Sequence, residues 1–425
     1  MMLANSSIAI FGLIDAAVVG HLENEAYLAG VALASVLFDF LYWGVTFLRM
    51  GTTGIVSQDY GSKNISRCQQ SLFEGVATAL VIAAVILVLH QPLMNFGLSL
   101  LSGSDAAVEQ AEVYFGLKIW GAPGVLMSMV IMGWLIGMQQ ATAVLKLTVV
   151  TSLLNAGLDL ILVFGFDLGI QGVAYAALIS SYFAAMWGAV LCFRVLSTLG
   201  ASKVMQLPKV ERMKRFLSLN FNIFIRTLCL IAAFSLFTRA GAQQGDTVLA
   251  ANALLLSLQM LLALALDGYA NALEVLVGES IGERNERGLM DSIAVGTFWS
   301  LLGACVFSIT YYFFGGQLLG LLTDIPAVHG TALQYLPWLV LSPLIAVWCF
   351  VFDGVFIGAT QGKAMRDSMI FALFAIFIPA LWLAKGHGNH GLWAAFMLFF
   401  AARGASMIVL FFRLNDRGVF IQASD

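Results

Sequence analysis

The sequence predicts an all-α integral membrane protein with twelve transmembrane helices, arranged as two six-helix lobes related by a pseudo-two-fold axis along the membrane normal. Its 425 residues are 60% hydrophobic and only 11% charged, whereas soluble domains carry roughly 25% charged residues. Apolar runs of about 20 residues recur from end to end, and a helix of that length crosses the hydrocarbon core of a bilayer. The second half of the chain also repeats the first.

The apolar runs place the helices one after another along the chain. We expect them at residues 1–20, 28–48, 70–91, 113–136, 144–165, 170–193, 217–240, 247–277, 291–314, 334–358, 365–385 and 391–413. These runs are continuous, whereas the strands of a membrane barrel alternate apolar and polar residues. The longest polar connection, RVLSTLGASKVMQLPKVERMKR, lies at the middle of the chain. We therefore expect an amino-terminal lobe at 1–193, a cytoplasmic linker at 194–216 and a carboxyl-terminal lobe at 217–425.

Lysine and arginine residues set the predicted orientation of the helices. Sixteen of the 21 lie in or beside the loops after even-numbered helices or in the carboxyl tail. Only Lys118, Arg239 and Lys385 lie near the opposite loops. Cytoplasmic loops carry an excess of these cations. We therefore expect a multi-pass protein of the cell (inner) membrane with both ends in the cytoplasm.

The two halves align in one ungapped register from the second predicted helix to the end of the fourth. The matched pairs include YLAGVA with VLAANA, Gly61 with Gly282, Asn64 with Asn285, and Gln140 with Gln361. Each half has an even number of spans, so both halves start on the same side of the membrane and the repeat axis runs along its normal. Two such bundles around a central cleft are typical of transporters that work by alternating access.

Four segments resemble the multidrug and toxic compound extrusion (MATE) family, and within it the DinF branch. GLIDAAVVGHLE is similar to the first-helix motif of that branch, and LRMGTTGIVSQDYGSKN is similar to the family segment with Gln58, Tyr60, Gly61 and Asn64 as its core. ALDGYANALEVLVGESIG and WCFVFDGVFIGATQGKAMRDSM resemble its helix 8 and helix 10–11 segments. Two features depart from the family pattern. Asp59 is unusual inside the second motif, and the chain starts without a polar, proline-containing lead-in, so we expect a shortened first helix.

The resemblance implies a cation-coupled exporter of amphipathic, mostly cationic drugs, and charges within the helices indicate how it is driven. Asp15 and Asp159 each lie about 15 residues from the cytoplasmic end of an outward-running helix, and Asn155 lies one turn before Asp159. No lysine or arginine is expected in the middle of any helix of this lobe. Two neighbouring carboxylates in a medium of low dielectric cannot easily both ionise, so at least one is expected to hold a proton near neutral pH.

Asp15, Asn155 and Asp159 are therefore the predicted proton-coupling site, a role that the resemblance also implies for the matching positions. Protonation of Asp15 from outside would remove its charge, let the first helix repack and release the drug. The alternative is that these acids only cap or hydrogen-bond neighbouring helices. Asn155 fits either a coupling role or a polar contact between helices.

The carboxyl-terminal lobe carries charges of both signs within its helices. Arg226, Asp267, Asp353 and Arg403 fall in the inner half of four different predicted helices. We expect them to form a self-neutralising lock, which contributes little net stability but is costly to break. The alternative is a second coupling site. Because the two arginines would already occupy the carboxylates, a sodium site is not favoured there.

Four further residues are candidates for contact with substrate. Asn271 and Glu274 share one face of helix 8 with Asp267, and Glu274 either attracts cationic drugs near the cytoplasmic mouth or extends toward solvent. Met127 and Trp134 lie in a methionine-rich stretch of helix 4. Such flexible and aromatic side chains re-pack around unlike ligands, although most residues of this kind are core or lipid-facing.

Composition and motifs limit the expected partners. We expect no cofactor other than transported protons, with sodium as the alternative ion, and no metal site, because no cysteine or histidine spacing fits one. The net charge of −3 and the lack of a basic tail give no reason to expect nucleic acid. The expected partners are amphipathic or cationic small-molecule drugs and the lipid bilayer, and the chain is expected to act as a monomer.

Other functions compete with proton-driven drug export. Sodium-coupled drug antiport on the same fold is the first alternative. A lipid-linked saccharide flippase is the second, but its phosphate-bearing cargo would need a basic cleft, and the charges expected in this cleft are acidic. An enzyme or an ATP-driven pump is not expected, because no HExxH, GxSxG or GxxxxGK[ST] motif occurs in a helix or phosphate loop.

Overall fold

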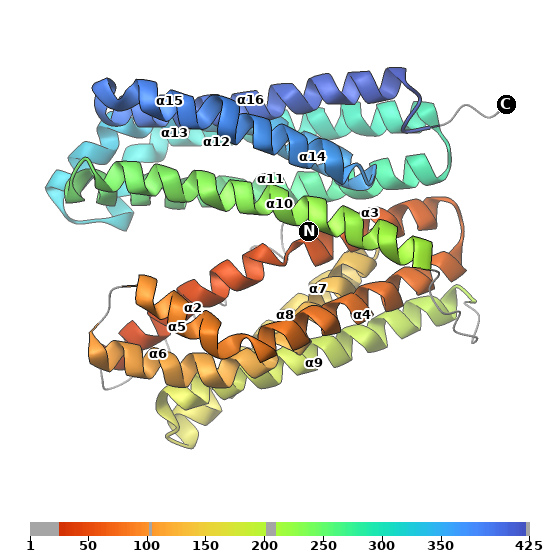
Figure 1. The fold of residues 1–425 in the computed structure, drawn as a ribbon, viewed down its shortest axis with the longest axis horizontal. Helices are drawn as coiled ribbons and strands as arrows, with labels where there is room; N and C mark the ends of the chain where they lie inside the picture. Colours follow the sequence, from red (N-terminus) through yellow and green to blue (C-terminus); the bar gives the residue numbers. More distant parts are fainter. Residues whose placement is uncertain (1–24, 102–103, 201–209, 422–425) are drawn as a thin grey trace. The chain divides into compact units, whose positions relative to one another are not determined.

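The computed structural model describes residues 25–101, 104–200 and 210–421. Within these residues every regular element is a helix (Figure 1), which confirms the predicted all-α class. The chain divides into two compact units, residues 3–217 and 218–425, and each is described by itself. The predicted first helix lies outside the described residues.

Among the described residues, eight helices and the first turns of a ninth form the first unit. They are α2 (Glu25–Gly44), α3 (Phe47–Gly61), α4 (Ile65–Val88), α5 (His90–Leu100), α6 (Asp105–Lys118), α7 (Ala122–Gly137), α8 (Ala141–Asp159) and α9 (Gly169–Thr198). A 3₁₀ turn, Ile119–Gly121, joins α6 to α7, and a π-helical segment, Leu160–Gly165, follows α8. The central helix is α7, which packs against α3, α4 and α9.

The second unit combines long and short helices around one central helix. They are α10 (Val210–Ala242), whose first turns belong to the first unit, α11 (Asp246–Gly282), α12 (Glu286–Leu322), α13 (Pro326–Gly358), α14 (Gly362–Ile370), α15 (Ile378–Leu383) and α16 (Gly388–Asp416). A π-helical segment, Phe371–Phe377, joins α14 to α15, and a 3₁₀ turn, Ala384–His387, leads into α16. The central helix is α13, which packs against α11, α12 and α16.

The local backbone geometry of the two units repeats as the sequence does. Lys63 and Arg284, which occupy matching positions of the two repeats, both adopt a left-handed φ of 56°. Each precedes an asparagine, Asn64 or Asn285, whose side-chain oxygen accepts a backbone N–H three residues on, at 3.0 and 2.8 Å respectively. Such a cap satisfies a donor that the first turn of a helix leaves open. The same hairpin therefore forms in both units.

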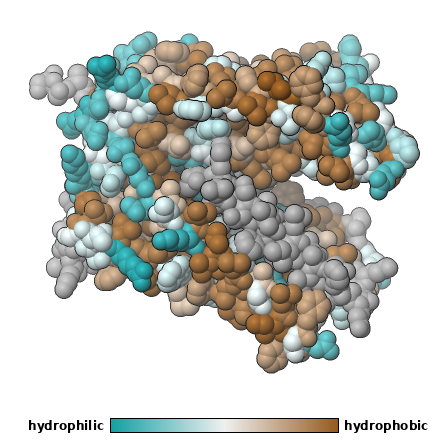
Figure 2. Space-filling model, turned by 180° about the vertical axis from the view of Figure 1, so that it is seen from behind, coloured by the Kyte–Doolittle hydropathy of each residue, from teal (hydrophilic) through white to brown (hydrophobic). Residues whose placement is uncertain are grey.

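The surface of the helices is suited to lipid. Ten helical segments of the described residues are long and apolar enough to cross a membrane, and one of them, Gly362–Asp416, includes both predicted helices 11 and 12. On α12, Phe298, Tyr312 and Phe313 are each more than 60% exposed. Figure 2 shows hydrophobic residues over much of one face, with hydrophilic residues mainly near helix ends. Extensive exposed apolar surface marks contact with a membrane, and the chain is a multi-pass membrane protein.

The second span is longer than the sequence predicts. The predicted end at residue 48 follows a drop in hydropathy, but α3 continues the span to Gly61. Thr52 and Thr53 are fully buried, and their hydroxyls donate to the carbonyls of Leu48 and Arg49 at 2.6 and 3.0 Å. Because these polar side chains are satisfied within their own helix, a polar stretch stays helical and buried.

This extension changes the charge distribution of the first unit. Arg49 now lies about three turns before the end of the second span and is half-buried. The expectation that no lysine or arginine lies in the middle of a helix of this lobe is therefore wrong for Arg49. The reason is that the predicted boundary left this residue in a loop.

Candidate functional site

Two of the three predicted coupling residues lie together on α8. Asp159 is the last residue of this helix, and its side chain has no solvent exposure. Nδ2 of Asn155 donates to Oδ2 of Asp159 at 2.8 Å, since residues four apart face the same side of a helix. The third predicted residue, Asp15, lies outside the described residues.

A π-helical segment begins directly after Asp159. It runs from Leu160 to Gly165 and packs against α9. Gly172 of α9 permits this close contact, because a Cβ there would lie 3.1 Å from the backbone carbon of Leu162. Such segments often accompany functional sites, since the wider turn shifts the surrounding side chains. The aligned stretch of the second repeat, 378–380, has no acid, so the repeat fold does not itself require Asp159.

The four charged residues predicted in the second unit converge on Asp353 of α13. Arg226 of α10 and Arg403 of α16 each donate a guanidinium N–H to its Oδ2. Asp267 of α11 interacts electrostatically with both arginines. Arg226, Asp353 and Arg403 are each at most 7% exposed. One network of two positive and two negative side chains, of which only Asp267 is half-buried rather than buried, therefore joins four helices.

The predicted substrate residues lie in different surroundings. Asn271 and Glu274 of α11 are 7% and 2% exposed, so the interpretation in which Glu274 extends toward solvent does not fit its burial. Trp134 has no exposure, and its Nε1 donates to the carbonyl of Cys68 at 2.8 Å. That contact favours a packing role for Trp134. Met127 is half-buried on α7.

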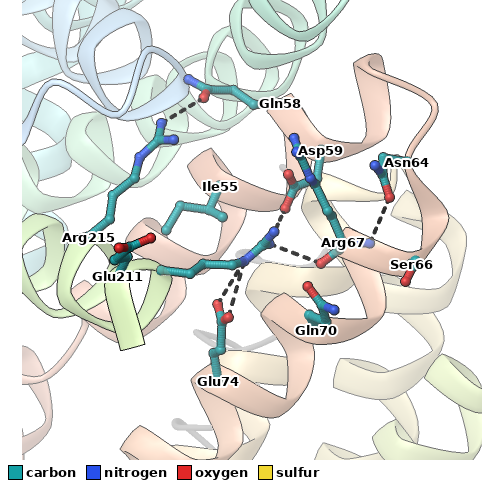
Figure 3. Close-up of a pocket in the computed structure, with 11 residues that line it drawn as sticks. Ile55, Gln58, Asp59, Asn64, Ser66, Arg67, Gln70, Glu74, Glu211 and Arg215 are labelled. Atoms are coloured by element: carbon teal, nitrogen blue, oxygen red, sulfur yellow. Dashed lines mark hydrogen bonds and ion pairs between the residues drawn. The ribbon is translucent and has the colours of Figure 1, made fainter. Parts of the chain in front are cut away.

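A polar pocket of about 600 Å³ in the first unit was not anticipated from the sequence. Figure 3 shows it where α3 ends, α4 begins and α10 starts. It is lined by Ile55, Gln58, Asp59, Asn64, Ser66, Arg67, Gln70, Glu74, Glu211, Arg212 and Arg215. Charged side chains of both signs therefore gather at one end of this unit.

Arg212 is the central cation of this pocket. Its Nη2 lies 2.5 Å from Oδ2 of Asp59, and its Nε lies 3.1 Å from Oε1 of Glu74. Nη2 also donates to Oγ of Ser71 at 2.5 Å and to the carbonyl of Arg67 at 3.1 Å. One guanidinium therefore holds two carboxylates and fixes the first turn of α10 against α3 and α4.

The second repeat shows that these acids are not needed for the hairpin. In the register that aligns Gly61 with Gly282, the counterparts of Asp59 and Glu74 are Ser280 and Val295, yet the second unit forms the same turn. Because only the first repeat has acids at these two positions, the sequence itself indicates that Asp59 and Glu74 pair with a residue that has no role in the repeated hairpin. Arg212 was predicted to lie in a polar linker, whereas the structure places it in α10.

Asp39, whose role the sequence leaves open, has a cation nearby. It interacts electrostatically with Lys118 of α6. Nζ of Lys118 donates to the hydroxyl of Tyr114 at 3.0 Å and lies 4.9 Å from the centre of the Phe38 ring. Lys118 is thus held by groups of its own unit.

Comparison with known proteins shows which family this arrangement belongs to. The MatE family model matches residues 1–161 and 223–383, one stretch in each half of the chain. The chain belongs to the MatE family. This MatE chain is 36% identical to DNA damage-inducible protein F of Escherichia coli over 100% of its own length and 92% of that protein. It is 22% identical to the probable multidrug resistance protein NorM of Bacillus cereus, over 98% and 94% of the two chains.

A solved structure shares the fold of this MatE chain. An outward-facing multidrug resistance MATE family transporter of the MOP superfamily matches it with a TM-score of 0.88, at 20% sequence identity, over 100% of this chain and 95% of that one. At this identity the likeness concerns the fold. The predicted resemblance to the MATE family and its DinF branch is confirmed by the family match and the Escherichia coli relative.

Proposed function

We propose that this MatE protein is a proton-driven antiporter that exports amphipathic or cationic compounds by alternating access. Membership of the family supports transport rather than an enzymatic reaction. Two similar proteins bear on the cargo. The Bacillus cereus relative is named a probable multidrug resistance protein, and the solved structure is that of a multidrug resistance transporter.

The observation that carries the proposal is the burial of Asp159 in a membrane-spanning helix. An ionised carboxylate in such a place is costly, and binding of a proton removes its charge. The amide of Asn155, 2.8 Å from Oδ2, donates to the ionised carboxylate and so stabilises the deprotonated state. The protonated state of Asp159 avoids a buried charge, and the deprotonated state gains the hydrogen bond from Asn155. Both states are therefore accessible, as a proton carrier requires.

In the proposed cycle, a proton and a cationic drug compete for the same negative charge. A proton that enters from outside binds Asp15 and removes its negative charge, while Asp159 is the second acid of the proposed site. The loss of charge lets the first helix repack and weakens binding of the drug, which leaves to the outside. Release of the proton to the cytoplasm restores the carboxylate and, with it, affinity for the next cation.

The second unit is less suited to bind the transported ion. Oδ2 of Asp353 accepts hydrogen bonds from both Arg226 and Arg403, so a cation there would have to displace two guanidinium groups. This favours the acids of the first unit as the coupling site. Sodium coupling at the same acids is the alternative that the following experiment separates.

Vesicles reconstituted with the full-length protein distinguish the two ions. An imposed pH gradient without sodium is expected to drive transport of a fluorescent organic cation such as ethidium, and a sodium gradient at equal pH is expected not to. Because the two gradients are imposed separately, each coupling ion gives its own signal. Transport driven by sodium alone would contradict the proposal.

Two substitutions test the acids themselves. Asp159→Asn and Asp15→Asn are each expected to abolish the pH-driven component of transport, because an amide binds no proton. The matched control is Asp167→Asn, which lies in the turn after the same span, is exposed and has a φ of 54°. Asparagine adopts that backbone conformation readily. Normal pH-driven transport by both test variants would refute the assignment.

We also propose that the protein works as a monomer in the cell membrane with both chain ends in the cytoplasm. The distribution of lysine and arginine supports this orientation. A cysteine introduced at Gln243 is expected to react with a membrane-impermeant reagent on intact cells, and one at Ser62 is expected to react only after the membrane is opened. Light scattering of the purified protein, corrected for detergent, tests the monomer.

A further inference from the structure

A second pocket lies at one end of the second unit, between the last turns of α10, the Ala384–His387 turn and the first turns of α16. Its volume is about 680 Å³. It is lined by Leu236, Arg239, Ala240, Gln243, Gln244, Ile378, Leu381, Trp382, Ala384, Lys385, Gly388 and Leu392. None of these residues is acidic, so the pocket combines positive charge with an apolar wall.

Arg239 and Lys385 give the pocket its charge. Both are exposed, and neither forms an ion pair with any residue that the structure describes. Three cations of the chain lie near the predicted outer loops, where lysine and arginine are disfavoured. The third, Lys118, is engaged by Tyr114. The other two meet in one pocket, which indicates that they serve an anionic ligand.

The wall beside these cations is apolar and partly exposed. Ile378, Leu381 and Trp382 come from α15, and Leu392 comes from α16. Trp382 is 69% exposed, and tryptophan is enriched where the hydrocarbon core meets the headgroups. A ligand that matches both parts of the pocket has an anionic head and an apolar chain.

The repeat fold does not require the two cations. When the register that aligns Gly61 with Gly282 is extended beyond the matched stretch, Val18 corresponds to Arg239, and Phe164 or, after a shift of two residues, Phe166 corresponds to Lys385. The first repeat therefore has apolar residues at both positions. The positive pair is a feature of the second repeat alone, as expected if it serves a ligand at that one place.

We propose that this pocket binds the headgroup of an anionic phospholipid of the outer leaflet. The guanidinium of Arg239 donates paired N–H groups to phosphate oxygens, for which its planar geometry is suited. The ammonium of Lys385 binds a further phosphate oxygen, and the amide of Gln243 donates to the polar head. An acyl chain lies along Trp382 and its apolar neighbours.

If Arg239 and Lys385 only stabilise the ends of their own helices, a different result is expected. Arg239 lies in the last turn of α10, and Lys385 lies in the 3₁₀ turn before α16. Cations at such carboxyl-terminal ends are stabilised by the helix dipole without any ligand. In that case the protein would show no preference among phospholipids.

The test uses the purified full-length protein in detergent, with bound lipid counted by native mass spectrometry. The probes are phosphatidylglycerol, phosphatidylcholine with the same acyl chains, and water-soluble glycerol 1-phosphate. We expect the wild type to retain phosphatidylglycerol in preference to the other two. Arg239→Gln/Lys385→Gln is expected to weaken retention of phosphatidylglycerol by about tenfold, because both charges near the headgroup are lost.

Two further variants make the result specific. Lys363→Gln/Arg413→Gln removes the same charge from exposed positions elsewhere in the unit and should keep the preference. Arg239→Lys/Lys385→Arg keeps both charges, should also keep it, and remains informative if the first variant fails to fold. Equal retention of the two lipids by the wild type, or equal loss in both glutamine variants, overturns the proposal. Glycerol 1-phosphate bound as tightly as phosphatidylglycerol also overturns it, in favour of a soluble phosphate ligand.

Discussion

Arg212 and Glu74 form an ion pair in which Nε of Arg212 lies 3.1 Å from Oε1 of Glu74. The side chain of Glu74 has no solvent exposure, that of Arg212 is 21% exposed, and Asp59 shares the same guanidinium. The pair joins the first turn of α10 to α4. Because two carboxylates depend on one cation, this contact is sensitive to any change at Arg212.

Arg212→Gln is expected to destabilise the protein by about 3 kcal/mol, because removal of one partner leaves the buried charge of Glu74 uncompensated. The double variant Arg212→Gln/Glu74→Gln is expected to recover part of this loss, since neither charge is then buried alone. Thermal unfolding in detergent measures both. Lys214→Gln, at an exposed position of the same turn, is the control, and equal stability of Arg212→Gln and this control would show that the pair contributes nothing.

The sequence was sufficient to predict the features that each repeat builds from local residues. The repeat that aligns Gly61 and Asn64 with Gly282 and Asn285 was visible in the sequence, and the structure forms the same hairpin at both places. The helices follow from hydropathy, because lipid selects continuous apolar faces. The four charged residues around Asp353 also come together, since charges inside helices need counter-charges.

The features that the sequence did not reveal depend on contacts between distant residues. Asp59 and Glu74 meet Arg212 from more than 130 positions away, and hydropathy alone places that arginine in a linker. The end of the second span was misplaced because buried threonines such as Thr52 satisfy their hydroxyls within the helix. A hydropathy average over a stretch of sequence scores threonine as polar and takes no account of the hydrogen bond that its hydroxyl makes within the helix.

Asp353→Asn is expected to be the most damaging single substitution in the second unit. It would leave Arg226 and Arg403, which are 7% and 4% exposed, close together without the carboxylate that offsets their positive charges. Loss of one member of a buried network costs about 3–5 kcal/mol. The measurement is the yield of monodisperse protein and its thermal unfolding in detergent.

A compensating variant distinguishes charge balance from other effects at Asp353. Asp353→Asn/Arg403→Gln removes one charge of each sign and leaves Arg226 with Asp267, so it is expected to be more stable than Asp353→Asn alone. Arg413→Gln, on the exposed part of the same helix as Arg403, should behave like the wild type. No recovery in the double variant would mean that the network is not held together by its charge balance.

Asn155→Leu is expected to slow pH-driven transport by about tenfold while leaving the protein folded. Its amide donates to the carboxylate of Asp159 at 2.8 Å, and a hydrogen bond to a charged group is worth about 1.5–3 kcal/mol. Dye transport in vesicles under a pH gradient measures the effect. Leu153→Ala, on the same helix and 57% exposed, is the control, and equal rates for the two variants would remove Asn155 from the coupling site.

Gly358→Ala is expected to destabilise the protein by roughly 1–3 kcal/mol, the usual cost of overpacking. A Cβ at Gly358 would lie 2.4 Å from the carbonyl oxygen of Glu274 and 3.0 Å from the backbone nitrogen of Gly278, so α13 and α11 would have to move apart. Gly330→Ala, in the same helix with nothing within 4 Å, is expected to be neutral or stabilising by up to about 1 kcal/mol, because alanine favours helix.

The repeat supplies an independent check on this close approach. Gly137, the counterpart of Gly358 in the first repeat, ends α7 in the same way, and a Cβ there would lie 2.9 Å from the carbonyl oxygen of Thr53 and 2.8 Å from Cβ of Val56. Gly137→Ala is therefore expected to lower the unfolding temperature, as Gly358→Ala does. Gly116→Ala, which meets nothing within 4 Å, is its control. Unfolding temperatures that do not separate Gly137→Ala and Gly358→Ala from their controls would show that neither central helix depends on these contacts.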